Sequence, residues 1–408
     1  MSRQRAAFAS VTTLFFAWGF ITVSVDPLIA TLKALYKLSF AEVMLTQFAF
    51  FMAYGIASLP ASVLVAKLGY PKAIVTALGI MMSGCLCMLI ATHIDKFSIV
   101  LVALFIIASG ITILQVAANP LAALLGAPER SHYRLTLSQA FNSLGTALAP
   151  YLVSSVILAG GIFIAQTGAA VTTIQRTETL RHIDAAFLVI AALLGLLAIF
   201  IWSIRRRLAQ SAVADGKHPA LIVDALRSPW ALTGALAIFL YVGAEVSIGS
   251  TMTNLLHQDD VFGFTLERAG RLVSMYWGGA MIGRFVGSAL LTRVRPGLLL
   301  GGAAIVAAIL CLLVSRTPGA AAGYAALSIG LFNSVMFPVI FTLTLERSTA
   351  SAAATSGLLC MAIVGGAVLP LLMGHIADLF GLRSAYVVPL AAYACISIFG
   401  VASSRARI

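Results

Sequence analysis

Residues 8–32 read FASVTTLFFAWGFITVSVDPLIATL, an apolar run whose one charged residue is Asp26, followed at once by Pro27. At about 1.5 Å per residue, a helix of this length crosses the hydrocarbon core of a bilayer. A carboxylate within such a helix costs about 2.5–3.5 kcal/mol on insertion scales, so it normally faces a water-filled interior. The alternative is that Asp26 lies near the membrane surface and caps the helix. The run predicts a membrane-spanning helix that bends at Pro27 and carries a functional carboxylate.

The composition of the whole chain also indicates a membrane protein. The 408 residues are 61% hydrophobic and 10% charged, against about 25% charged in soluble domains, and the mean hydropathy is +1.02. Nucleotide-binding GxGxxG and GxxxxGK[ST] motifs, the zinc motif HExxH and paired cysteines are missing from the sequence. We therefore expect no enzyme activity, no metal site and no cofactor.

Apolar runs separated by short polar segments predict an all-α membrane protein with twelve transmembrane helices. The predicted spans lie near 8–32, 41–66, 73–92, 98–125, 135–159, 184–204, 229–255, 268–292, 297–315, 319–345, 352–377 and 384–402. With the N-terminus inside, sixteen of the 26 basic residues lie on the inner side and nine on the outer side. This bias predicts that both termini are cytoplasmic. It explains the net charge of +12 through topology, without a nucleic-acid partner.

The longest polar inner segment, residues 205–228, predicts a linker between two six-helix bundles, 1–204 and 229–408. The halves resemble each other: GTALAP at 145–150 recurs as GGAVLP at 365–370, and mid-span prolines occur in ANP at 118–120 and MFP at 336–338. Two bundles in pseudo-twofold repeat, with interrupted helices at matching places, describe the fold of major facilitator transporters.

Four amide side chains in the first half are candidate ligand-binding residues. Gln115 and Asn119 lie four residues apart in the fourth span, and Gln139 and Asn142 lie three apart in the fifth, so each pair shares a helix face. Amides both donate and accept hydrogen bonds without charge, which suits a neutral polyhydroxylated ligand. The alternative is that they join helices to one another, as polar residues in membranes often do.

The second half contributes one carboxylate and one arginine within its spans. Glu245 lies about halfway along the seventh span, and Arg284 follows Gly283 in the eighth. Counting residues from the span ends places Arg284 well below Glu245, so we expect no ion pair and assign Arg284 to a cytoplasmic gate. A structural role for Glu245, paired with a cation, is the alternative. Among the aromatic residues, Trp18, Tyr276 and Trp277 are candidates for stacking on a sugar ring, with core or membrane-interface positions equally open.

Seven stretches resemble the sugar–proton symporters of the fucose and glucose/galactose branch of the major facilitator superfamily. They read FFAWGFITVSVDPLIATLK, LTQFAFFMAYGIASLPASVLVAKLGYPKAI, LQVAANPLAALLG, RLTLSQAFNSLGT, YVGAEVSIGS, GRFVG and SGLLCMAIVGGAVLP. The resemblance implies that Asp26 carries the proton and that Gln139 and Asn142 bind the sugar. Fucose-type members carry a glutamate where this chain has Gln115, so the ligand preference leans to glucose or galactose.

The resulting expectation is a monomeric transporter that moves a neutral hexose with protons across the lipid bilayer by alternating access. A sodium-coupled or uncoupled sugar carrier, and a carrier of N-acetylglucosamine, share the fold and remain alternatives. A proton/drug antiporter would prefer bulky apolar cations, for which amides are poor ligands. A non-transporting receptor would bind sugar without moving it.

Overall fold

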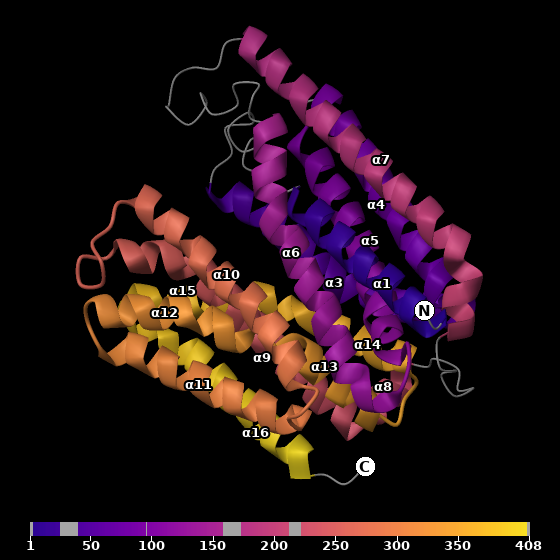
Figure 1. The fold of residues 1–408 in the computed structure, drawn as a ribbon. Helices are drawn as coiled ribbons and strands as arrows, with labels where there is room; N and C mark the ends of the chain where they lie inside the picture. Colours follow the sequence, from indigo (N-terminus) through magenta and orange to yellow (C-terminus); the bar gives the residue numbers. More distant parts are fainter. Residues whose placement is uncertain (1–2, 25–39, 95, 158–172, 212–221, 406–408) are drawn as a thin grey trace. The chain divides into compact units, whose positions relative to one another are not determined.

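A computed structural model describes residues 3–24, 40–94, 96–157, 173–211 and 222–405, and these residues form helices and connecting turns without a strand (Figure 1). The helices of the first half are α1 (Arg3–Ser24), α3 (Phe40–Leu68), α4 (Tyr70–Ile94), α5 (Phe97–Leu124), η1 (Pro128–Arg130), α6 (Ser131–Ile157) and α7 (Thr173–Ser211).

The second half contains α8 (Ile222–Arg227), α9 (Pro229–His257), α10 (Leu266–Leu290), α11 (Pro296–Arg316), α12 (Ala320–Asn333), α13 (Met336–Arg347), α14 (Ala352–Met361), η4 (Ala362–Val364), α15 (Gly365–Phe380), η5 (Ser384–Tyr386) and α16 (Val387–Arg405). Within the described residues, nine helical stretches are long and apolar enough to cross a membrane. Together with α1, α6 and α10 they account for the twelve predicted spans.

The chain divides into two compact units. The first comprises Met1–Leu121 and Phe141–Ala212, and the second comprises Ala122–Ala140 and Val213–Ile408. The division after Ala212 falls within the segment predicted as a linker, 205–228. The grouping of Ala122–Ala140 with the second unit has no counterpart in the predicted boundaries. As a result α6 is shared, because its first ten residues belong to the second unit and the rest belong to the first.

Glycines bring helix backbones together inside the first unit. A Cβ built on Gly19 would overlap the backbone of Asn142, and one built on Gly145 would overlap the carbonyl of Phe16. Helices α1 and α6 therefore pack at backbone contact, which small residues permit in membrane proteins. On another side of this unit, α7 packs along α4 (Figure 1).

In the second unit α9 occupies the centre, packed against α10, α13, α15 and α16, while α11 lies along α12 and α16 (Figure 1). The tenth span is interrupted between α12 and α13, and the eleventh changes to a 3-10 turn at η4. The predicted matching interruption in the first half is wrong, since α5 continues through Pro120 to Leu124. Proline removes one backbone donor, and a membrane helix tolerates that loss where its surroundings compensate.

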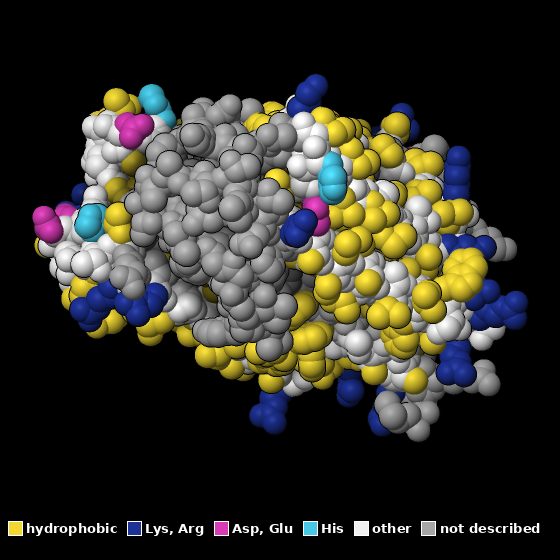
Figure 2. All heavy atoms as spheres, turned by 90° about the horizontal axis from the view of Figure 1, so that it is seen from above, with side chains coloured by type: hydrophobic (Ala, Val, Ile, Leu, Met, Phe, Trp, Pro, Cys, Tyr) yellow, Lys and Arg dark blue, Asp and Glu magenta, His cyan; other side chains and the backbone are white. Residues whose placement is uncertain are grey.

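The surface has the composition of a lipid-facing protein. Large apolar side chains are exposed along the helices, among them Leu196, Ile199, Leu371 and Ile398, which are 64–73% exposed. Figure 2 shows hydrophobic side chains over much of the described part of one face, with Lys and Arg projecting at its margins. Such a surface is unfavourable in water and suits contact with acyl chains.

Candidate functional site

The first pair of predicted amides is buried beside a tyrosine. The Gln115 side-chain Nε2 donates to the Tyr54 hydroxyl at 2.6 Å, which joins α5 to α3. Asn119 has no exposed surface, whereas Gln115 retains 9%. The hydrogen bond orients the Gln115 amide and leaves its oxygen as an acceptor. Sequence reasoning missed Tyr54, although a tyrosine within a span needs a hydrogen-bond partner for its hydroxyl.

The second pair lies on α6, where this helix meets α1. Asn142 Nδ2 donates to the Phe15 carbonyl at 3.0 Å, and the Asn142 side chain is partly exposed, while Gln139 is 6% exposed. Trp18 is buried and contacts Phe15 edge-on at a centroid distance of 5.4 Å. Asn142 thus joins α6 to α1. Asp26, the predicted proton carrier, lies outside the described residues.

Glu245 is at the centre of a polar network in the second unit. Its carboxylate accepts from the Tyr241 hydroxyl at 2.7 Å, and the Arg284 guanidinium lies 3.9 Å away. Tyr241 precedes Glu245 by four residues on α9, so the two side chains share one helix face. The four-residue spacing of Tyr241 and Glu245 could have predicted this hydrogen bond from the sequence.

The predicted separation of Arg284 from Glu245 is wrong. Counting residues from the helix ends neglected the inclination of the helices and the length of the arginine side chain. The helices pack closely beside Arg284, because a Cβ on Gly283 would overlap the Leu331 carbonyl of α12. Glycine at this position brings α10 against α12 and lets the guanidinium reach inward. The pair neutralises two charges that would each be costly alone in an apolar interior.

Arg284 also compensates for the break in the tenth span. Pro338 has no backbone N–H, so the carbonyl of Ser334, four residues earlier, loses its helical partner. Arg284 Nε donates to this carbonyl at 3.2 Å. One cation therefore serves both the carboxylate of α9 and the interruption between α12 and α13.

Tyrosines and an asparagine extend the network behind Glu245. The Tyr276 hydroxyl is 3.4 Å from the Glu245 carbonyl, and Asn333 Nδ2 donates to the hydroxyls of Tyr276 at 2.8 Å and Tyr393 at 3.3 Å. Tyr276 is fully buried, which places it among core aromatics. Trp277, by contrast, is 48% exposed and covers Gly249 of α9.

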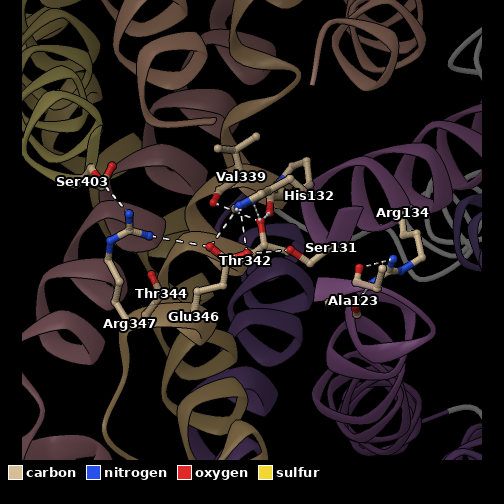
Figure 3. Close-up of polar contacts among 12 residues, drawn as sticks. Ala123, Ser131, His132, Arg134, Val339, Thr342, Thr344, Glu346, Arg347 and Ser403 are labelled. Carbon is tan, nitrogen blue, oxygen red and sulfur yellow. Dashed lines mark hydrogen bonds and ion pairs between the residues drawn. The ribbon is translucent and has the colours of Figure 1, made fainter. Parts of the chain in front are cut away.

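A second polar cluster lies at the start of α6, between the predicted spans 98–125 and 135–159. His132 is the second residue of α6 and is buried. Its ring contacts Thr342 and Glu346 of α13, and Ser131 also donates to Glu346 (Figure 3). Nearby, Arg134 donates to the carbonyls of Ala122, Ala123 and Ala127 and so caps the end of α5.

Among the described residues, no group of three or more His, Cys, Asp or Glu side chains is placed to hold a metal ion. Within the second unit, the Glu245 carboxylate is balanced by the Arg284 guanidinium. At 3.9 Å Arg284 neutralises Glu245 without a short hydrogen bond, so the carboxylate retains acceptor capacity for ligand hydroxyls.

Comparisons with known proteins agree with this fold. The chain is 41% identical over 98% of its length to the glucose/galactose transporter of Brucella abortus, covering 94% of that protein. It is 30% identical to the L-fucose-proton symporter of Escherichia coli, over 96% of this chain and 92% of the relative. The crystal structure of FucP, a Major Facilitator Superfamily transporter in the outward conformation, superposes with a TM-score of 0.90 at 27% identity, covering 99% of this chain and 100% of FucP.

These relatives are transporters rather than enzymes, and the fold is that of a multi-pass membrane protein with twelve helices. The sequence profile of the Major Facilitator Superfamily matches residues 7–359, most of the chain. The protein belongs to the major facilitator superfamily.

Proposed function

We propose that the protein imports a hexose, glucose or galactose, together with protons, by alternating access. The observation that carries the proposal is the full-length likeness to the Brucella glucose/galactose transporter, at 41% identity. The likeness to the L-fucose-proton symporter, at 30% identity, supports proton coupling. Gln115 in place of the fucose-type glutamate favours the glucose/galactose type.

In this proposal Asp26 carries the proton, and the sugar-binding residues are Trp18, Gln115, Asn119, Gln139, Asn142, Glu245 and Trp277. Gln139 and Asn142 share a helix face, and the Asn142 amide is partly exposed. Glu245 accepts from sugar hydroxyls, because a charged acceptor makes a stronger hydrogen bond than a neutral one.

Arg284, first assigned to a cytoplasmic gate, acts in this proposal as the counter-charge of Glu245. Its positive charge offsets part of the cost of burying the Glu245 carboxylate in an apolar interior. The membrane is a bacterial inner membrane, both termini are cytoplasmic, and the transporter works as a monomer. The bundles are 1–204 and 229–408, joined by 205–228.

The test is radiolabelled galactose uptake into proteoliposomes, with unlabelled glucose, galactose, L-fucose and N-acetylglucosamine as competitors. Glucose and galactose should compete at the lowest concentrations. Competition by L-fucose or N-acetylglucosamine at lower concentrations would move the substrate assignment to that sugar. Binding without uptake would indicate a receptor. Uptake that follows an imposed sodium gradient and ignores a pH gradient would overturn proton coupling.

A further inference from the structure

A groove on the surface of the second unit runs between α9 and α16. Its volume is about 400 Å³, and it is lined by Trp230, Leu236 and Leu240 of α9 and by Ile398, Phe399 and Ala402 of α16. Leu236 is 58% exposed and Ile398 is 70% exposed, so the groove is open to its surroundings. In a membrane-spanning protein an open apolar groove suits an aliphatic chain rather than water.

The groove is as long as one leaflet of a bilayer is thick. Along α9 its lining runs from Pro229 to Leu240, which is about 16 Å at about 1.5 Å per residue. The hydrocarbon core of a bilayer is about 30 Å thick, so one leaflet contributes about 15 Å. Pro229 is the first residue of α9, and Leu240 lies before the middle of this helix. The groove therefore has the length of one acyl chain that enters from the leaflet beside the start of α9.

Two arginines lie at the end of the groove that Ala402 lines. Arg347 donates to the Ser403 carbonyl at 2.8 Å, and its Cζ lies 5.5 Å from the centre of the Trp230 ring. Arg405 follows Ala402 by three residues on α16, so the two side chains share one face of the helix. The positive charges are thus next to the two ends of the lining that come from α9 and α16.

A third arginine reaches the same end from α11. Arg295 directly precedes α11, and a Cβ on Gly297 would overlap the Gly400 carbonyl of α16. Arg295 and Arg405 are exposed, and among the described residues neither forms an ion pair. Arg347 is partly offset by Glu346 at 3.7 Å. An apolar groove therefore ends beside two exposed positive charges that no protein carboxylate neutralises.

We propose that this groove binds an anionic phospholipid, with one acyl chain between α9 and α16 and the phosphate at Arg295 and Arg405. The guanidinium group suits this role because it makes two parallel hydrogen bonds to phosphate, and basic pockets between membrane helices bind anionic head groups. Trp230 supplies an indole N–H at the level of the lipid esters, where tryptophan is common. Because α9 also carries Glu245, the bound lipid would brace the helix of the candidate sugar-binding carboxylate.

The alternative is an ordinary boundary lipid. Any phospholipid can fill a groove that faces the bilayer, and arginines at the ends of spans also serve to orient a protein in the membrane. The two interpretations differ in one measurable property, because only the proposed site prefers a negatively charged head group.

Photo-crosslinking of the full-length protein in phosphatidylcholine vesicles tests this inference. The probe is a trace of phosphatidylglycerol that carries a diazirine in its acyl chain, and mass spectrometry locates the cross-linked peptides. Part of the phosphatidylcholine is then replaced by unlabelled phosphatidylglycerol or by the same fraction of zwitterionic phosphatidylethanolamine. The variants are Arg295→Gln/Arg405→Gln and Ala402→Phe, which fills the groove. The matched control is Lys67→Gln/Arg206→Gln, which removes the same charge from exposed positions of the first unit.

We expect cross-links within 229–240 and 395–402 in the wild type and the control, which unlabelled phosphatidylglycerol reduces and phosphatidylethanolamine does not. They should fall about fivefold for each arginine removed, the effect typical of a basic residue beside an anionic membrane surface. Ala402→Phe should also reduce them. Phosphatidylglycerol added in detergent should raise the unfolding temperature of the wild type and the control more than that of either groove variant, because a ligand stabilises the state that binds it.

Equal competition by the two unlabelled lipids would identify a boundary lipid and overturn the proposal. Cross-links that persist at full strength in Arg295→Gln/Arg405→Gln would overturn the role of the arginines, and cross-links confined to other helices would overturn the site. Both arginines are exposed, so this variant should fold, and the competition in the wild type decides the lipid preference without it. None of these measurements requires sugar transport, so they stand even if the proposed function fails.

Discussion

Arg284 places its guanidinium 3.9 Å from the carboxylate of Glu245 while its Nε donates to the carbonyl of Ser334 at 3.2 Å. Both contacts offset the free-energy cost of burying a polar group in an apolar interior. The first compensates the buried charge of Glu245, and the second compensates a carbonyl that Pro338 leaves without a helical donor. The arginine therefore connects the candidate sugar-binding carboxylate of α9 to the interrupted span α12–α13.

Removing this arginine should destabilise the protein strongly. Arg284→Met leaves Glu245 as an uncompensated buried charge, and breaking a buried pair in this way typically costs about 3–5 kcal/mol. The double variant Arg284→Met/Glu245→Gln should recover part of the loss, which thermal unfolding in detergent measures. Arg316→Gln is the control, because Arg316 is exposed at the end of α11. Equal unfolding temperatures for the single and double variants would argue against charge compensation.

The backbone contact between α1 and α6 predicts that a larger residue at Gly145 lowers stability. Gly145→Ala puts a methyl group against the Phe16 carbonyl and should cost about 1–3 kcal/mol, the usual range for overpacking. Gly79→Ala on α4 is the matched control, since its Cβ would meet nothing within 4 Å. There alanine should be neutral or stabilising by up to about 1 kcal/mol. Thermal unfolding of both variants checks the pair, and a similar response from the two would refute the close contact.

Substitution of the two amides of α6 tests whether these side chains bind the ligand or only join helices. Gln139→Ala and Asn142→Ala should each weaken sugar binding about ten- to a hundredfold, because a lost hydrogen bond to a buried partner costs about 1–3 kcal/mol. Calorimetric titration with glucose and galactose measures this effect. Asn142→Ala should also lower stability, since Asn142 bonds the Phe15 carbonyl. Reduced stability with unchanged affinity in both variants would assign the amides to helix packing alone.

Sequence reasoning could predict the twelve helices because each is a separate apolar run whose length matches a bilayer. Ser131, His132 and Glu346 were missed because their contacts join residues more than two hundred positions apart. The Arg284–Glu245 pair was mispredicted because residue counting gives height along a helix but neither its inclination nor the reach of a side chain. The break before α13 could be predicted, because Pro338 marks it directly in the sequence.

The two candidate carboxylates should separate sugar recognition from proton coupling. Glu245→Gln removes a charged acceptor, so sugar affinity should fall more than coupling does. Asp26→Asn should do the reverse, leaving affinity largely intact and abolishing coupling. Sugar binding and sugar-induced alkalinisation of the medium, measured side by side in both variants, make the comparison. Normal sugar binding with loss of proton movement in Glu245→Gln would exchange the two roles.

The central claim, that a hexose enters with protons through Asp26, is tested most directly by galactose accumulation in proteoliposomes under an inwardly directed pH gradient. The wild type should concentrate radiolabelled galactose above its external level and lose that accumulation when a protonophore is added. Asp26→Asn should only equilibrate the sugar across the membrane. Accumulation that persists in Asp26→Asn, or a wild type that ignores the pH gradient, would contradict the account.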